Sequence, residues 1–322
     1  MGALLVTGGA GFIGSNLVER LLERGDRVIA LDNFDPYYDP AIKRRNLQEA
    51  SSPRHAGRFR LVEADIRDRD ALDSLFSGGD IDAVVHLAAR AGVRPSIADP
   101  LLYEDVNVKG TANLLEACRT HGVRRFVFGS SSSVYGDSTA VPFSEGARVD
   151  RPVSPYAATK VAGELMCYTH HHLFGIGVFC LRFFTVYGPR QRPEMAIHKF
   201  ARLILEGRPL PRFGDGRTER DYTYVDDILD GLVKAIDKVE GYDIFNLGES
   251  RRVGLSRLIE LLEGEIGRRA IVEPLPDQPG DVKMTCADIS HARAKLGYDP
   301  RVPIEEGIRL FVAWLKAGRV GA

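Results

Sequence analysis

The stretch that decides the fold is Val6-Thr7-Gly8-Gly9-Ala10-Gly11-Phe12-Ile13-Gly14, near the start of a chain of 322 residues. It follows the short apolar run Leu4-Leu5-Val6 and opens a segment with apolar residues on one helical face. Glycines at this spacing allow a tight turn and a close approach of the backbone to a pyrophosphate, while the helix N-terminus directs N–H groups at the anion. The stretch therefore predicts a strand, a turn and a helix that bind a dinucleotide.

The segments after the next strands support the same site. Asp32 ends the second predicted strand, where a carboxylate accepts from ribose hydroxyls and repels a 2′-phosphate, which favours NAD over NADP. Ala64-Asp65-Ile66 follows the third strand and Leu87-Ala88-Ala89 follows the fourth. The alternative is that the glycines serve turn geometry alone, with Asp32 a solvated strand end. The regular placement of these groups at strand C-termini favours the binding site.

Short β-branched runs alternate with amphipathic stretches over the first half of the chain. We expect strands at 4–6, 27–31, 59–63, 83–86, 126–128 and 178–182, and helices near 12–24, 68–77, 105–121 and 155–174. This alternation predicts an α/β fold with a Rossmann-type, doubly wound parallel sheet. After residue 184 the sequence becomes rich in Pro, Gly and Arg. We expect a Rossmann domain over 1–184, joined by segments around 222–247, and a smaller α/β substrate domain mainly over 185–322.

Composition excludes several classes of protein. The 43 Lys and Arg balance 44 Asp and Glu, so no net charge draws the chain to nucleic acid or to an acidic membrane surface. No apolar run reaches 18 residues, and we expect a cytoplasmic protein. The four cysteines form no CxxC pair, and His170-His171-His172 point about 100° apart on a helix. We therefore expect reduced thiols and no metal site.

A second motif, formed by Tyr156 and Lys160, has the residue types that catalyse proton transfer. Tyr156 and Lys160 are spaced i and i+4 on a predicted helix, so they share a face. A nearby ammonium and a positively charged nicotinamide would both lower the pKa of the phenol and let Tyr156 act as a general base toward an alcohol. The serine run in Gly129-Ser130-Ser131-Ser132-Ser133-Val134-Tyr135-Gly136 follows the fifth strand and offers hydroxyls to relay the proton. A surface Tyr/Lys pair and turn-forming serines are the alternatives.

Together these motifs resemble the extended short-chain dehydrogenase/reductase family over essentially the whole chain. The resemblance implies an enzyme with NAD as cofactor, a homodimer built on the helices near 105–121 and 155–174, and Ser131, Tyr156 and Lys160 as the catalytic residues. Phe183 would lie beside the nicotinamide. The residues expected at the cofactor are Gly8, Gly11, Phe12, Ile13, Asp32, Asn33, Lys43, Asp65, Ile66, Leu87, Ala88, Ala89, Tyr156, Lys160 and Phe183.

Within that family, the segments 32–40, 89–94 and 183–189 resemble UDP-glucuronate 4-epimerases. Relatives that dehydrate or decarboxylate the sugar have an acidic residue just before Val-Tyr-Gly, where this chain has Ser132 and Ser133. The resemblance thus implies epimerisation at C4 through a 4-keto sugar. The alternatives are a UDP-glucose or UDP-N-acetylglucosamine 4-epimerase or, in another class, a catalytically silent NAD-binding regulator. An intact proton relay speaks against the regulator.

The expected substrate site is basic. Between Arg182 and Arg220 there are nine Lys or Arg and four Asp or Glu, which suits a UDP-uronic acid. Arg192 is the candidate clamp for the sugar carboxylate, with a solvated surface arginine as the alternative. Thr185 replaces the usual asparagine of UDP-galactose 4-epimerases, and Gln278 stands where the family often has arginine. The expected substrate residues are Arg94, Ser131, Ser132, Ser133, Tyr156, Thr185, Arg192, Lys199, Arg220 and Asp281.

Overall fold

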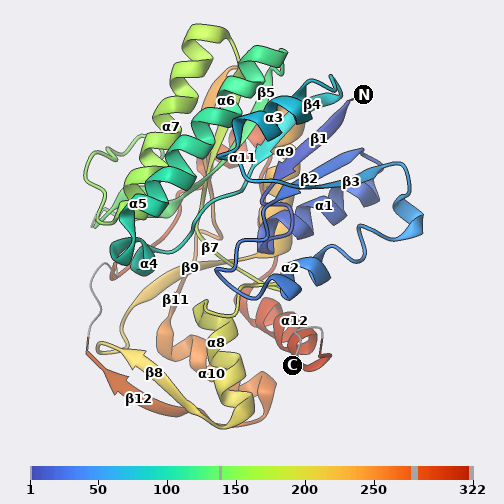
Figure 1. Ribbon diagram of the computed structural model, residues 1–322. Coiled ribbons are helices and arrows are strands. Elements are labelled where there is room, and N and C mark those ends of the chain that lie inside the picture. The colour runs from blue at the N-terminus through green and yellow to red at the C-terminus, as the bar shows by residue number, and fades with distance from the viewer. Residues whose placement is uncertain (1, 138–139, 277–281, 319–322) are drawn as a thin grey trace.

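A seven-stranded parallel sheet forms the centre of the computed structural model, which describes residues 2–137, 140–276 and 282–318 (Figure 1). Its strand order is β10-β6-β5-β4-β1-β2-β3. The chain reverses direction across the sheet between β1 and β4, which is where doubly wound sheets place their ligand crevice. The strands are β1 (Ala3–Thr7), β2 (Val28–Asp32), β3 (Phe59–Glu63), β4 (Ile81–His86), β5 (Arg125–Ser131), β6 (Gly177–Phe183) and β10 (Tyr242–Leu247).

Alternation along the strands supplies a core on each face of the sheet. In β1, Leu4 and Val6 pack into one hydrophobic cluster and Leu5 into the other, because successive side chains of a strand point to opposite faces. All three are buried. A strand buried on both faces must be apolar throughout, which explains the continuous apolar runs that predicted these strands.

Helices cover both faces of the sheet. One face carries α1 (Phe12–Arg24) and α9 (Val225–Lys238), which pack against each other, and the opposite face carries α3, α6 and α7 (Figure 1). Apart from α1 and α9, the helices of this part have the following bounds: α2 (Pro40–Asn46), α3 (Arg69–Phe76), α4 (Val93–Ala98), α5 (Pro100–Tyr103), α6 (Gly110–His121), α7 (Pro155–Phe174) and α11 (Ser290–Leu296).

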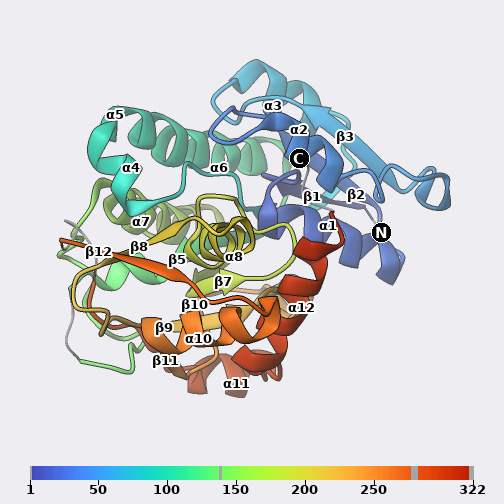
Figure 2. The ribbon, with the colours of Figure 1, turned by 90° about the horizontal axis from the view of Figure 1, so that it is seen from below.

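A smaller part of the molecule lies beyond the carboxyl ends of the sheet. It contains a three-stranded sheet in the order β11-β9-β7 and a parallel pair of β8 and β12. Figure 2 shows α10 and α12 on the opposite side from α4, α5 and α6. The elements are β7 (Thr185–Tyr187), α8 (Ala196–Glu206), β8 (Pro209–Phe213), β9 (Glu219–Tyr224), β11 (Arg252–Gly254), α10 (Leu255–Ile266), β12 (Ile271–Leu275) and α12 (Ile304–Lys316).

The expected α/β class and Rossmann-type sheet are confirmed. The helices expected at 12–24 and 155–174 have those bounds, and the helix expected near 105–121 is present with a π-helical first part. A π-helical segment, Glu104–Lys109, precedes α6 there, and it carries the buried Asn107. The Asn107 side chain accepts from the backbone N–H of Arg90 (2.8 Å) and donates to its carbonyl (3.0 Å). In the described part of the chain, no helix is both long and apolar enough to cross a bilayer.

Candidate active site

A cavity of about 400 Å³ opens at the carboxyl edge of the large sheet. Carboxyl ends of parallel strands meet at one edge, so loops that are distant in sequence line it together. Every residue expected at the cofactor lies on its wall, from Gly8 in the first loop to Phe183 at the end of β6. Of the residues expected at the substrate, the cavity brings together Ser131, Ser132, Ser133, Tyr156, Thr185 and Arg192.

One end of the cavity, which we call the glycine end, is built from backbone. Gly8 has a φ of +67°, and a Cβ atom on Gly14 would stand 2.1 Å from the Gly8 carbonyl oxygen. These two glycines therefore let the loop close on itself. Gly11 is the N-cap of α1, and no side chain caps that helix. The N–H groups of the first turn of α1 thus face the cavity without a side-chain acceptor, as an anion site requires.

Asp32 is a buried carboxylate that organises the turn after β2. Its Oδ2 accepts from the N–H of Ala10 (3.1 Å), and its Oδ1 accepts from the N–H of Phe34 (2.8 Å) and from Lys43 Nζ (3.3 Å). A carboxylate has about four lone-pair sites, so Asp32 retains capacity for a ligand hydroxyl. The position expected for a ribose contact is therefore rigid and negatively charged.

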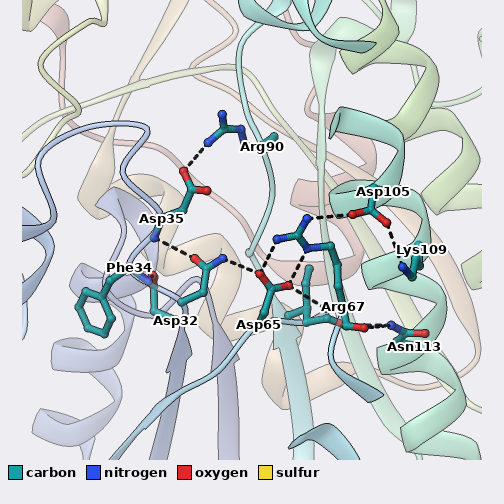
Figure 3. A network of polar contacts seen from close by, with 11 residues as sticks. Asp32, Phe34, Asp35, Asp65, Arg67, Arg90, Asp105, Lys109 and Asn113 are labelled. Carbon is teal, nitrogen blue, oxygen red and sulfur yellow. Dashed lines mark hydrogen bonds and ion pairs between the residues drawn. The ribbon is translucent and has the colours of Figure 1, made fainter. Parts of the chain in front are cut away.

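Asp65 belongs to a charged network at the same end (Figure 3). Its two oxygens accept from Arg67 Nε (2.9 Å) and Nη2 (2.8 Å), and Asn33 Nδ2 donates to Oδ2 (2.8 Å). The Arg67 guanidinium beside it lowers the pKa of Asp65 to about 2. Arg67 Nη1 also reaches Asp105 (2.8 Å), which joins the loop after β3 to the π-helical segment. The spacing of the sequence predicted Asp65 but not this network.

The catalytic candidates lie together on the cavity wall. Lys160, buried on α7, donates from Nζ to the carbonyl of Gly129 (2.7 Å) and lies 6.0 Å from the centroid of the Tyr156 ring. Ser131, at the end of β5, donates from Oγ to Ser133 Oγ (3.0 Å). Tyr103 packs edge-on against Tyr156, with 6.3 Å between ring centroids. Strand β5 and helix α7 thus bring the serine, the phenol and the ammonium into one wall.

The direction of the Tyr156 shift differs from the expectation. Burial raises the pKa of Tyr156, and the opposing contributions come from the Ser131 hydroxyl and the Arg192 guanidinium. Burial also lowers the pKa of Lys160 to about 8, because the ammonium loses its water. The helical spacing predicted the two neighbours, but it contained no information on how deeply they are buried.

A second part of the cavity wall, which we call the arginine end, is built from side chains and is linked through Asp35 and Asn33 to Asp65 (Figure 3). The Arg192 guanidinium lies 5.6 Å from the centroid of the Tyr37 ring, and that of Arg90 lies 4.9 Å from the same ring. Arg90 also contacts the carboxylate of Asp35. Sequence reasoning assigned no role to Tyr37, Arg90 or Asp35, all of which line the cavity. The sequence feature that could have indicated these residues is the long turn-rich segment after the second strand. This segment contacts the loop after the fourth strand through the Asp35–Arg90 pair.

Three described residues that were expected at the substrate, Arg94, Lys199 and Arg220, do not line the cavity. Arg94 on α4 lies 4.8 Å from the centroid of the Phe213 ring, and Lys199 on α8 is exposed. Arg220 on β9 donates to the carbonyls of Glu219 (3.0 Å) and Lys283 (3.3 Å). Asp281, like the neighbouring Gln278, falls outside the described residues. Their roles stay predictions.

His86, the potential metal ligands and the cysteines are the other groups of the chain that could carry chemistry. His86 is buried, its two ring nitrogens contact the hydroxyls of Thr7 (2.8 Å) and Thr111 (2.9 Å), and burial lowers its pKa to about 3. It is therefore a neutral core histidine. Within residues 2–137, 140–276 and 282–318, no three His, Cys, Asp or Glu side chains are grouped to hold a metal ion. The cysteines Cys118, Cys167, Cys180 and Cys286 are free thiols.

Known proteins resemble this chain over nearly its full length. A UDP-glucuronate 4-epimerase of Thermodesulfobacterium geofontis is 44% identical over 98% of this chain and 97% of that protein. The crystal structure of Bacillus cereus UDP-glucuronic acid 4-epimerase with UDP-glucuronic acid and NAD is similar with a TM-score of 0.92 and 39% identity, covering 98% of this chain and 99% of that one.

A structure with a neutral sugar is also similar. Thermotoga maritima UDP-glucose 4-epimerase with UDP-glucose gives a TM-score of 0.90 at 33% identity, covering 98% of this chain and 99% of that chain. The model of the NAD dependent epimerase/dehydratase family matches residues 4–248, which contain the glycine loop, the serine run and the Tyr156–Lys160 pair. The chain belongs to the NAD dependent epimerase/dehydratase family.

Proposed function

We propose that this chain is an NAD-dependent UDP-glucuronate 4-epimerase, an isomerase that interconverts UDP-glucuronate and UDP-galacturonate through a 4-keto sugar. The observation that carries the proposal is the joining, in one cavity, of the glycine end, the Ser131, Tyr156 and Lys160 cluster, and Arg192. Relatives named UDP-glucuronate 4-epimerase that are 44% and 43% identical support the choice of substrate.

The glycine end fits NAD by its own chemistry. The uncapped N-terminus of α1 and Gly11 suit a pyrophosphate, and Asp32, with Asn33 and Lys43 beside it, suits the adenosine ribose. Asp65 and Ile66 would hold the adenine, Leu87, Ala88 and Ala89 would face the cofactor backbone, and Phe183 would face the nicotinamide. NAD, when bound, supplies a reversible hydride acceptor with a positively charged ring.

Tyr156 is the proposed base. In its phenolate form it takes the proton of the C4 hydroxyl, and it returns a proton to O4 after the 4-keto sugar has presented its other face. Burial holds the pKa of this phenol up, so the phenolate forms only when positive charge faces it. Ser131 passes the proton between the sugar oxygen and Tyr156, because a hydroxyl donates and accepts at once.

Lys160 supplies positive charge near the phenol. Its Nζ is held by the Gly129 carbonyl at 2.7 Å, so the ammonium is fixed rather than mobile. The pKa of about 8 means that this charge is lost in mildly alkaline solution. Activity should therefore depend on the protonation of Lys160.

Arg192 is the proposed clamp for the substrate carboxylate, and Thr185 and Ser132 line the same cavity. A guanidinium binds a carboxylate with two parallel hydrogen bonds. The 4-keto intermediate is a β-keto acid, which loses carbon dioxide when its carboxylate aligns with the carbonyl. A clamp that keeps the carboxylate charged and out of alignment favours epimerisation over decarboxylation. Ser133 would contact the sugar, and Arg220 and Lys199 would bind the diphosphate. Arg94 and Asp281 are further proposed substrate contacts.

The test is to incubate the purified protein with UDP-glucuronate, UDP-glucose and UDP-N-acetylglucosamine in parallel, and to resolve the products by proton NMR. Axial and equatorial hydrogens at C4 differ in coupling. Formation of UDP-galacturonate alone is the expected result. Conversion of only a neutral sugar would refute the carboxylate clamp, and no turnover of any sugar would favour the silent regulator.

We also propose a homodimer. Apolar side chains are exposed on α5 and α7, among them Leu101 (75% exposed), Leu165 (63%), Leu173 (61%) and Tyr168 (51%). Large exposed apolar groups on neighbouring helices are typical of an interface. Light scattering should give twice the chain mass for the wild type and a monomer for Leu165→Glu.

We further propose that the protein acts in the cytoplasm, where its thiols stay reduced. Cell fractionation would test this location.

A further inference from the structure

Arg182 is a fully buried arginine directly behind the catalytic cluster. It lies on β6, is 1% exposed, and donates from Nε (2.9 Å) and Nη2 (2.7 Å) to the two carboxylate oxygens of Glu164. Replacing a buried ion pair by apolar residues is often neutral or stabilising, so stability alone does not account for such a pair. Its partners give a better account.

Glu164 lies on the catalytic helix. It follows Lys160 by one turn of α7 and Tyr156 by two, so the three side chains share a face. Its Oε1 also accepts from Ser130 Oγ at 2.5 Å, while Lys160 donates to the carbonyl of Gly129. Two successive turns of α7 are thus bound to two successive residues of β5, immediately before Ser131.

Arg182 extends the same connection to two further elements. It pairs with Ser130 across the sheet and precedes Phe183, the residue beside Ser131 in the neighbouring strand. Its Nη1 donates to the hydroxyl of Tyr135 (3.0 Å), at the end of the turn that holds the serines. The Tyr135 hydroxyl in turn donates to Asn246 Oδ1 (2.6 Å) on β10. One ion pair therefore fixes the helix, both strands and the serine turn relative to one another.

The Glu164–Arg182 ion pair also affects the protonation of Lys160. The groups that face Lys160 are Tyr156, Glu164 and Cys167 on its own helix and His86 on β4. His86 is neutral, and the Glu164 carboxylate opposes the effect of burial on the Lys160 pKa. Loss of the Glu164 charge would leave Arg182 uncompensated and weaken the hold of Lys160 on its proton.

We propose that the Glu164–Arg182 ion pair is a positioning element for the reaction, which holds Tyr156 and Lys160 in register with Ser131 through Ser130 and Gly129. Neither residue lines the cavity, so each acts through its neighbours. The inference rests on the proposed function only in taking Tyr156 and Lys160 as the proton-transfer groups. A buried pair used purely for folding would not need to bind the residue next to the catalytic serine.

The first test is Glu164→Gln in the holoenzyme, a change that keeps the shape and removes the charge. We expect kcat to fall about 100-fold with KM for UDP-glucuronate within about two-fold, because the reacting groups are misplaced while the substrate contacts remain. The alkaline limb of the kcat profile should move to lower pH. The matched control is Asp227→Asn, a buried carboxylate that binds the N–H groups of Arg301 (2.9 Å) and Val302 (3.0 Å). The Asp227→Asn variant should keep the wild-type kcat and the wild-type position of the alkaline limb.

A second variant separates geometry from charge. Arg182→Lys keeps the positive charge but loses the two-pronged contact, so we expect kcat to fall about ten-fold with the alkaline limb in place. In both variants, amide hydrogen exchange in the first turns of α7 should be faster than in the wild type and in Asp227→Asn. This measurement needs no turnover, so it reports on positioning even if the wild type fails to convert UDP-glucuronate and the proposed function is wrong.

The outcomes decide between positioning and folding. Variants that melt at a lower temperature but keep kcat, the pH limb and the exchange of the wild type would show that the pair is structural only. A rise in KM with unchanged kcat would likewise overturn the proposal. If Glu164→Gln does not fold, Arg182→Lys alone tests the same expectation through kcat and exchange.

Discussion

The glycine end and the arginine end of the cavity are built in different ways. At the glycine end, backbone groups and short carboxylates follow consecutive strands, and Asp32 and Asp65 each bind donors from their own loop, namely Phe34 and Arg67. At the arginine end, long side chains from distant loops meet on Tyr37. The first end depends on close backbone packing and the second on charge. The two should therefore fail in different ways when mutated.

Tyr156, on the wall of the same cavity, should give the largest effect. Tyr156→Phe removes the proton acceptor and leaves both ends intact, so kcat should fall about 10³-fold or more. Initial rates followed by NMR would measure this. Retention of bound NAD, quantified after denaturing the protein, is the control and should match the wild type. A variant that keeps more than a tenth of the rate would remove Tyr156 from the mechanism.

Gly14→Ala should break the glycine end. The added Cβ would meet the Gly8 carbonyl oxygen, which is backbone and cannot rotate away. We expect a loss of about 3 kcal/mol in the free energy of unfolding, and weaker NAD binding. Denaturant titration measures the first and NAD titration the second. Gly264→Ala is the matched control, because nothing lies within 4 Å of that exposed helical position. The control should be neutral or slightly stabilising.

Arg192→Ala should break the arginine end without affecting folding. The loss of a charge-assisted contact, about 2 kcal/mol, should raise KM for UDP-glucuronate about 30-fold and increase the pentose by-product of decarboxylation. NMR of the product mixture reports both. Arg202→Ala, on the exposed surface of α8, is the control. If KM and the by-product both stay at wild-type levels, the clamp is assigned to the wrong residue.

The pH dependence of kcat sharpens the comparison by testing a third group of the cavity wall, the Lys160 ammonium. The pKa of Lys160 is about 8, so kcat should fall about ten-fold per pH unit above that value as the ammonium loses its proton. The stability contribution of this group has the opposite sign. Because the unfolded chain keeps its proton to higher pH, the contribution rises as pH increases from about 8 toward the ordinary pKa of lysine. A flat kcat profile through pH 9 would exclude the role of Lys160.

Much of the fold follows from local patterns. The strand at 59–63 and the helices at 12–24 and 155–174 have the predicted bounds, because apolar periodicity depends only on neighbours in the sequence. The position of β10 does not follow in this way. This strand pairs with β6, which ends 59 positions before β10 begins, and the helix α9 that precedes it packs on α1, β5 and β6.

The sequence by itself determined the glycine turn, the Tyr156 and Lys160 spacing, and the placement of Asp32 and Asp65 at strand ends. Each of these is a relation within one strand–turn–helix unit, where bond geometry sets the distances. The tertiary structure decided the Arg90–Asp35 contact, the pairing of Glu164 with Arg182, and the direction of the Tyr156 pKa shift. Burial and long-range pairing depend on which segments pack together, and no local pattern records that.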